Sequence, residues 1–195
     1  MTFPRPLRAL GILAAVAVVS SPGILGQTQK IDVKQSSFKI SVFKSGFFSA
    51  FGHNHEIQAP ISAGTVDQSK PSVTLSVQSA DLRVLDPEAS PGTRADVQKT
   101  MLGPDVLDTE RFPQISFHST SIEPAGTNLW NVRGDLALHG ETKPLEVRVS
   151  LVDGHYRGVV TLKQRDFGIA PVSVAGGTVK VKNEVKVEFD VVVEH

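Results

Sequence analysis

The chain has 195 residues, of which 40% are hydrophobic, and it carries 20 basic and 20 acidic residues, so its formal net charge is zero. A balanced charge gives no electrostatic basis for binding nucleic acid or an anionic membrane surface. The sequence contains no cysteine, which excludes disulfides and thiolate chemistry, so a fold of this length must be stabilised by burial alone.

The N-terminal segment has the layout of a secretory signal peptide. Arg5 and Arg8 precede an apolar run from Leu10 to Val19, and small and turn-forming residues follow up to Gly26. The run is shorter than the ~20 apolar residues that a transmembrane helix needs, and a retained anchor is the alternative reading. We therefore predict a signal peptide over residues 1–26 and a single mature domain over residues 27–195 that is secreted or periplasmic, without a membrane span.

Nine segments of the mature chain are predicted to be strands, because their apolar residues alternate with polar ones or because turn-forming residues bound them. In the last segment Val185, Val187 and Phe189 share one face, whereas Lys186 and Glu188 share the other. So many strands with short links favour an all-β, lipocalin-like closed antiparallel barrel of about eight strands, because closure removes unpaired edges. The predicted strands are residues 38–44, 53–60, 64–67, 72–80, 114–122, 129–139, 145–152, 155–164 and 178–193.

Residues 86–108 break the strand pattern, because they contain Pro87, Pro91 and Pro104. We predict one short helical connection here, between Thr93 and Leu102. Such a helix either packs against the outside of the barrel or forms a lid over one of its mouths. Residues 139–144 are predicted to form a hairpin turn, with the proline at its end confined to a strand start or edge.

Three phrases follow one another in a specific order: Phe112–Thr120 (FPQISFHST), Gly134–Gly140 (GDLALHG) and Glu141–Pro144 (ETKP). Their arrangement resembles the YceI-like family, and the resemblance continues through Gln164–Ile169 and the terminal strand Val185–Asp190. It covers nearly the whole mature chain. The resemblance implies a lipocalin-like shape and a secreted or periplasmic protein that binds long isoprenoid lipids.

The strand faces assigned to the interior are rich in β-branched and medium-sized apolar side chains. A barrel of this size is either filled by its own side chains or shares its interior with one ligand. Together with the resemblance, this composition predicts an exported lipid-binding protein that holds a long amphiphilic ligand of the polyisoprenoid type. The residues predicted to line its lumen are Phe38, Ile40, Val42, Val73, Leu75, Phe117, Trp130, Leu136, Leu138, Val147, Tyr156, Val160, Val187 and Phe189.

His53 and His55 stand two positions apart on a predicted strand, on the same side as Ile57 and Ala59. Two imidazoles at this spacing are candidates for contacting a ligand head group or for binding a metal ion. A metal site needs at least a third ligand, and Glu56 falls on the opposite face. We therefore expect a head-group contact or a structural hydrogen bond, and no cofactor other than the bound lipid. The YceI-like pattern commonly has a single histidine here, and this sequence departs from it with a pair. The departure bears on which ligand is bound, and leaves the expected fold unchanged.

The sequence gives little support for catalysis. His118, Ser119 and Thr120 are adjacent strand residues, so neighbours point to opposite faces and no third group orients them. We predict a protein that is not an enzyme. Two alternatives to lipid binding remain, namely a barrel that binds metal or a small molecule through the histidine pair, and a non-catalytic structural or stress-related protein with a filled barrel. A homodimer is also left open.

Overall fold

The computed structural model describes residues 28–45, 54–174 and 179–194, which form one antiparallel sheet, one α-helix and short 3-10 helices. The predicted signal peptide and His53 lie outside the described residues. The strands are β1 (Thr28–Lys30), β2 (Ser37–Ser45), β3 (His55–Pro60), β4 (Ala63–Asp67), β5 (Ser72–Gln78), β6 (Arg83–Val84), β7 (Gln114–Gly126), β8 (Leu129–Leu138), β9 (Glu141–Val152), β10 (His155–Lys163), β11 (Ser173–Val174) and β12 (Val179–Val192). The helices are α1 (Pro91–Leu102), η2 (Ser79–Asp81) and η3 (Gln164–Phe167).

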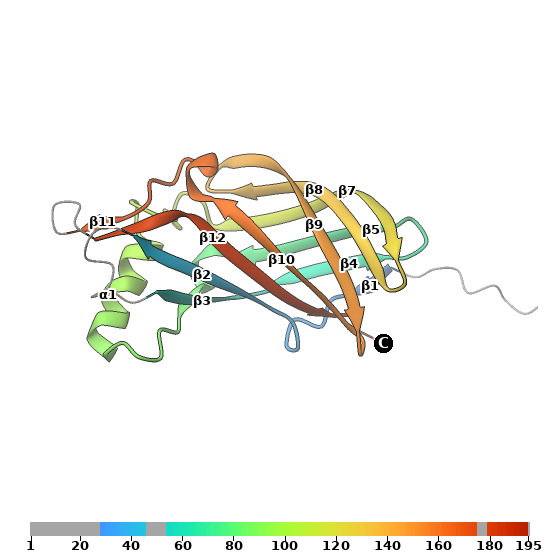
Figure 1. Cartoon of the computed structure of the whole chain (residues 1–195), viewed down its shortest axis with the longest axis horizontal. Helices are drawn as coiled ribbons and strands as arrows, with labels where there is room; N and C mark the ends of the chain where they lie inside the picture. Colours follow the sequence, from blue (N-terminus) through green and yellow to red (C-terminus); the bar gives the residue numbers. More distant parts are fainter. Residues whose placement is uncertain (1–27, 46–53, 175–178, 195) are drawn as a thin grey trace, which may run out of the picture.

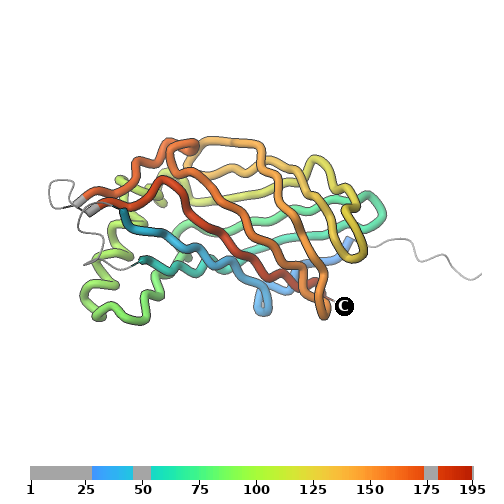
Figure 2. Tube along the Cα trace, in the orientation of Figure 1, coloured from blue at the N-terminus to red at the C-terminus, as the bar shows by residue number. Residues whose placement is uncertain are grey.

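The sheet curls around a long axis, as Figures 1 and 2 show. Its strand order is β1-β4-β5-β7-β8-β9-β10-β12-β2-β3-β6, and β11 pairs with β12. The predicted all-β class, the antiparallel pairing and the single short α-helix are confirmed. Closure into a barrel of eight strands is not, because the described residues form twelve strands and no ladder joins the two ends of this order.

Isolated links draw the two ends of the sheet together instead. The chain leaves β1 at Ile31, which bridges Val193 just after β12. Ser62, in the bend between β3 and β4, donates its backbone N–H to the carbonyl oxygen of Ser76 in β5 at 2.8 Å. The segment from β3 to β4 therefore pairs first with β2 and then with β5, which is how a bent strand turns a corner in a curled sheet.

The hairpin between β8 and β9 is tighter than predicted. Its turn is limited to His139 and Gly140, which both have positive φ angles, of 52° and 78°. This geometry is typical of a two-residue turn whose twist matches that of the flanking strands. The predicted tight hairpin is confirmed, but its turn is shorter than residues 139–144, because β9 already begins at Glu141. Pro144 lies inside β9, but at a point where only β8 pairs with it, since β10 joins β9 from Val149 onward.

Helix α1 covers one end of the curled sheet (Figure 1). It begins two residues before the predicted start, because Ser90 caps it by accepting a hydrogen bond from the backbone N–H of Thr93 at 3.1 Å. Gln98 fixes the helix to β6: its amide oxygen accepts from the backbone N–H of Val84 at 2.7 Å, and its amide nitrogen donates to the carbonyl of Leu82 at 2.8 Å. The helix is thus a fixed cover at this end.

The buried core is divided into two clusters. The larger lies at the α1 end of the molecule, and the smaller lies where Ile31 crosses β12. The larger cluster comprises Ile57, Ala59, Val77, Leu82, Val84, Met101, Leu107, Leu136, Phe167 and Ile169. The smaller comprises Ile31, Ile61 and Val191.

Two inward-facing aromatic rings lie across glycines of the neighbouring strand. The Phe117 ring covers Gly134 of β8 so closely that a Cβ on this glycine would lie 2.7 Å from the ring's Cε2 atom. Likewise, a Cβ on Gly158 of β10 would lie 2.7 Å from Cε1 of Phe189. Real Cβ atoms do not approach other carbons this closely, so the glycines are needed for the rings to lie along the wall.

We therefore expect Gly134→Ala to lower the free energy of unfolding by about 1–3 kcal/mol, because the added methyl displaces Phe117 or the backbone of His118. Gly92→Ala in α1 is the matched control, since the nearest atom to its new Cβ is 3.9 Å away. This control should change stability by no more than about 1 kcal/mol, in the stabilising direction. Urea denaturation measures both, and equal stabilities of the two variants would contradict the role given to Gly134.

Candidate functional site: an apolar cavity inside the curled sheet

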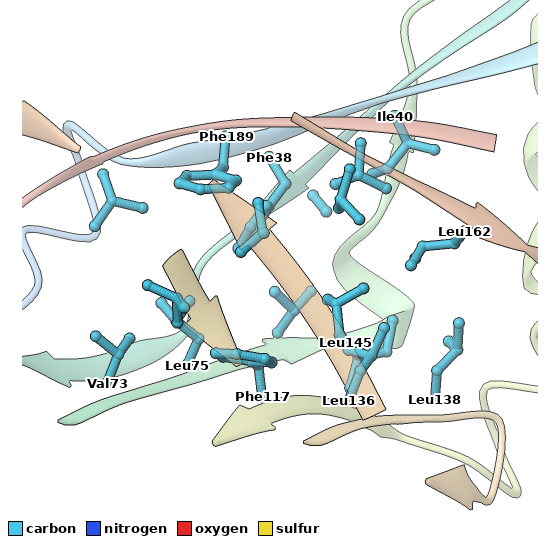
Figure 3. A pocket seen from close by; sticks show the side chains of 18 of the residues that line it. Phe38, Ile40, Val73, Leu75, Phe117, Leu136, Leu138, Leu145, Leu162 and Phe189 are labelled. Carbon is cyan, nitrogen blue, oxygen red and sulfur yellow. The ribbon is translucent and has the colours of Figure 1, made fainter. Parts of the chain in front are cut away.

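A cavity of about 670 Å³ lies inside the curled sheet. Its volume falls within the range of roughly 300–1,000 Å³ that is usual for sites enclosing one small molecule. Strands from all around the sheet contribute to its wall. In Figure 3, Phe38 and Phe189 point into it from one side, and Leu75, Phe117 and Leu136 point into it from the opposite side.

The structure places all fourteen residues predicted to line a lumen on the wall of this cavity. The alternation of apolar and polar residues found them, because it assigns every second residue of a strand to one face. It missed the wall residues in non-strand segments, where no period of two exists. Met101, Leu107, Phe167 and Ile169 are among them.

The cavity is not filled by the side chains around it. Phe38, Leu75, Phe117 and Phe189 face inward, yet each is only half-buried. In the described part of the chain, Ser79 is the largest side chain that is fully buried. A packed barrel interior would bury its aromatic and leucine side chains completely. These observations favour an open interior over the alternative of a filled barrel.

The α1 end of the cavity is closed by buried side chains. Phe167 and Ile169, from and just after η3, are 3% and 4% exposed and lie on the cavity wall beside Met101 and Leu107. Helix η3 contacts β9, β10 and β12, and so occupies the space where β9 and β10 diverge. A hydrogen bond of 3.0 Å between Nδ1 of His139 and the carbonyl oxygen of Phe167 joins η3 to the turn between β8 and β9.

The opposite end of the cavity opens to solvent. Three of the described wall residues are exposed, and all three lie in two turns: Gln68 and Pro71 between β4 and β5, and Asn128 between β7 and β8. Both turns are at the end of the molecule away from α1 (Figure 1). We call the opening between these turns the mouth.

His55 does not behave as a cavity ligand. Its Nδ1 atom forms a 2.6 Å hydrogen bond with Oδ2 of Asp86, whose side chain is only 2% exposed. The other oxygen of Asp86 accepts from the backbone N–H of Glu56 at 2.7 Å. Ile57 and Ala59, on the same side of β3, do line the cavity, whereas His55 is not among the described residues that do. The geometry thus favours a structural hydrogen bond, which joins β3 to the segment before α1.

Within the described ranges, no group of three or more histidine, cysteine or acidic side chains is arranged to hold a metal ion. Charged side chains instead pair on the outer surface. On that surface Asp190 accepts from Arg157 at 2.8 Å and from His155. Partial burial raises the pKa of the Asp190 carboxyl, but the hydrogen bonds from His155 and Arg157 outweigh this effect and lower it overall.

The fold and the site together define a β-barrel-type protein, with an apolar cavity that is closed at one end and open at the other. No helix in the described ranges is long and apolar enough to cross a membrane. The model of the YceI-like domain matches residues 29–193, so the chain belongs to the YceI-like family. This membership confirms the resemblance carried by the FPQISFHST, GDLALHG and ETKP phrases.

Relatives and solved structures agree with this assignment. A UPF0312 protein of Vibrio cholerae is 24% identical over 194 residues, which cover 94% of this chain and 97% of that protein. A UPF0312 protein of Shewanella denitrificans is 30% identical over 173 residues, covering 81% of this chain and 84% of that protein. The crystal structure of Burkholderia cenocepacia BcnA aligns with a TM-score of 0.61 at 20% identity, over 85% of this chain and 99% of that one. The YCEI protein of Campylobacter jejuni aligns with a TM-score of 0.51 at 13% identity, over 71% and 81% of the two chains.

We expect Asp86→Ala to lower the free energy of unfolding by about 1–3 kcal/mol, because it removes a buried carboxylate that accepts from the backbone N–H of Glu56 and bonds to His55. Asp96→Ala, at an exposed position in α1, is the control and should change stability by no more than about 0.5 kcal/mol. Chemical denaturation provides the comparison. If both variants were equally stable, Asp86 would have no structural role.

The metal alternative can be tested by elemental analysis of the purified protein. We expect no stoichiometric transition metal, because within the described ranges no two further ligands are arranged beside His55 to complete a site. About one zinc, copper or nickel ion per chain, lost on His55→Ala and released as the pH falls through ~6.5, would establish a metal site instead.

Proposed function

We propose that this protein binds one long amphiphilic lipid of the polyisoprenoid type, with the lipid tail in the cavity and its head group at the mouth. The observation that carries the proposal is the unfilled cavity of about 670 Å³ with an almost entirely apolar wall. Membership of the YceI-like family supports the same conclusion, because the family resemblance implies isoprenoid binding.

Burial of the tail supplies the driving force in this proposal. Each CH₂ group transferred from water to an apolar site contributes roughly 0.8 kcal/mol, so each isoprene unit adds a few kcal/mol before ordering costs are subtracted. A long tail is therefore sufficient for tight binding without any specific polar contact. The half-buried rings of Phe38, Phe117 and Phe189 would become fully covered by such a tail.

The asymmetry of the cavity gives the ligand a direction. Phe167, Ile169 and Met101 close the α1 end with buried apolar side chains, which suits the terminal methyl groups of a tail. The mouth carries exposed polar groups, which suit a solvated head. We infer that the tail enters first through the mouth.

The proposed setting is outside the cytoplasm. The layout of residues 1–26 supports export through a signal peptide, and the balanced charge of the chain gives no reason to expect nucleic acid as a partner. We propose a carrier or store of lipid that performs no chemistry and needs no cofactor.

The direct test is mass spectrometry of an organic extract of the protein purified from its native host. We expect a long-chain lipid in near-stoichiometric amount, because the cavity would otherwise expose its apolar wall. Intrinsic fluorescence gives a second measurement, since Trp130 is the single tryptophan of the chain and lines the cavity. A cleanly extracted protein without lipid, whose Trp130 emission does not respond to added prenols, would refute the proposal.

A matched pair of substitutions locates the binding site. Val187→Lys places an ammonium on the cavity wall and should weaken lipid retention at least roughly tenfold, because burial of an unpaired charge is costly. Val159→Lys makes the same change on the outer face of the neighbouring β10, where Val159 is 52% exposed and pairs with Glu188, and should retain lipid normally. Circular dichroism checks that both variants fold. Normal retention by a folded Val187→Lys would show that the lipid binds elsewhere.

A further inference from the structure

The cavity wall is nearly free of charge. Asp67, at the mouth, is the one charged residue among the described side chains that line it, and no lysine, arginine or histidine of the described ranges does so. The cations of the surrounding strands lie outside, where Lys39 pairs with Glu56 and Arg133 pairs with Glu146. An anionic group on a lipid would therefore enter the mouth without a counter-charge on the wall.

The one charged residue on the described part of the wall is negative and fixed. Oδ1 of Asp67 accepts from the backbone N–H groups of Ser69 and Lys70 at 2.8 and 3.0 Å, and from the Ser69 hydroxyl at 2.6 Å. Oδ2 accepts from the hydroxyl of Thr28 at 3.1 Å. These bonds, with that from the Ser69 side chain as the largest contribution, lower the pKa of Asp67 to about 2. The carboxylate thus stays ionised at neutral pH and repels a phosphate placed beside it.

Neutral polar groups, in contrast, face the cavity near the mouth. Trp130 and Tyr156 are the second residues of β8 and β10, and both line the cavity, with ring centroids 6.1 Å apart. Among the described residues, no hydrogen bond engages the indole N–H of Trp130 or the hydroxyl of Tyr156. Neither atom is buried, because no buried side-chain nitrogen or oxygen of these residues lacks a partner. The two groups are free to bind a hydroxyl or carbonyl oxygen of a ligand.

The remaining amides at the mouth differ in availability. The side chain of Gln68 already donates to Gln29 at 2.8 Å, whereas Asn128 is exposed in its turn. Lys70 also belongs to the turn between β4 and β5, but its side chain is exposed and is not part of the wall. A phosphate would have to leave the cavity to reach it, and would meet it in water, where an ion pair contributes little.

We propose that the mouth selects lipids with a neutral head group bearing hydroxyl or carbonyl oxygens, bound by Trp130 and Tyr156, and discriminates against phosphorylated lipids with the same tail. The inference rests on the proposed function, because it names the class of head group for the tail-binding cavity. Its physical basis is the combination of two unpaired neutral donors with one fixed negative charge.

The test compares two probes that share one tail, geranylgeraniol and geranylgeranyl monophosphate. Each is titrated into the delipidated protein in mild detergent, and binding is followed by Trp130 fluorescence and confirmed by co-elution in gel filtration. We expect the prenol to bind at least about tenfold more tightly than the phosphate. Equal binding of the two probes, or tighter binding of the phosphate, overturns the inference but leaves lipid binding intact. Failure of both probes to bind overturns the proposed function and the inference with it.

A gain of phosphate binding tests the charge argument in a way that misfolding cannot imitate. Gln68→Lys puts a cation on the wall of the mouth and should raise the affinity for geranylgeranyl monophosphate about tenfold relative to the affinity for the prenol. Gln78→Lys, exposed at the opposite end of β5, is the matched control and should change neither affinity. Equal effects of the two substitutions would contradict the role given to the mouth.

Tyr156→Phe tests the neutral contact itself, because it removes the hydroxyl and keeps the ring. We expect the affinity for the prenol to fall about three- to tenfold, while the weak affinity for the phosphate stays unchanged. If Tyr156→Phe left the affinity for the prenol unchanged, the Tyr156 hydroxyl would not contact the head group, and the head-group assignment would be wrong.

Discussion

The central constraint on this molecule is the period of two in its strands, imposed on a sheet that curls around itself. Every second side chain must face the axis, so the inward set has to be apolar along the full length of β7, β8, β9, β10 and β12. The same alternation sends charged side chains outward, where Lys39 pairs with Glu56 and Arg133 with Glu146 across neighbouring strands. One pattern thus provides both the solvated outer surface and, among the described residues, an interior wall whose one charged member is Asp67 at the mouth.

Curling a sheet does not by itself leave room inside, and the inward side chains decide whether it is filled. Here most are valines, leucines and isoleucines, and two of the aromatic rings lie against the wall because glycine faces them. Phe117 covers Gly134, and Phe189 covers Gly158. The rings therefore add apolar surface to the wall with less intrusion into the cavity than an upright ring would cause. The two buried clusters lie at the α1 end and where Ile31 crosses β12.

The sequence predicted the long strands and the fourteen wall residues well, because long alternating segments carry a clear signal. It missed β1, β6 and β11, which have too few residues to show any period. It also missed the closed end, because Phe167 and Ile169 belong to an irregular segment. The pairing of His55 with Asp86 joins residues 31 positions apart and has no local signature. The alternation of residues along the strand correctly placed His55 on the face of Ile57. It could not show that the buried carboxylate of Asp86 forms a hydrogen bond with the His55 imidazole.

An unfilled apolar interior also links binding to stability. The half-buried Phe38, Leu75 and Phe189 give less stabilisation than they would in a packed core, because part of their surface still lies against the cavity. A tail that covers this surface binds only the folded chain, so it must stabilise the fold by mass action, increasingly as its concentration exceeds its dissociation constant. A packed interior would have been more stable alone, but it would have had no capacity for a ligand. The glycines beneath Phe117 and Phe189 let these rings lie along the wall, and so keep the interior open to such a tail.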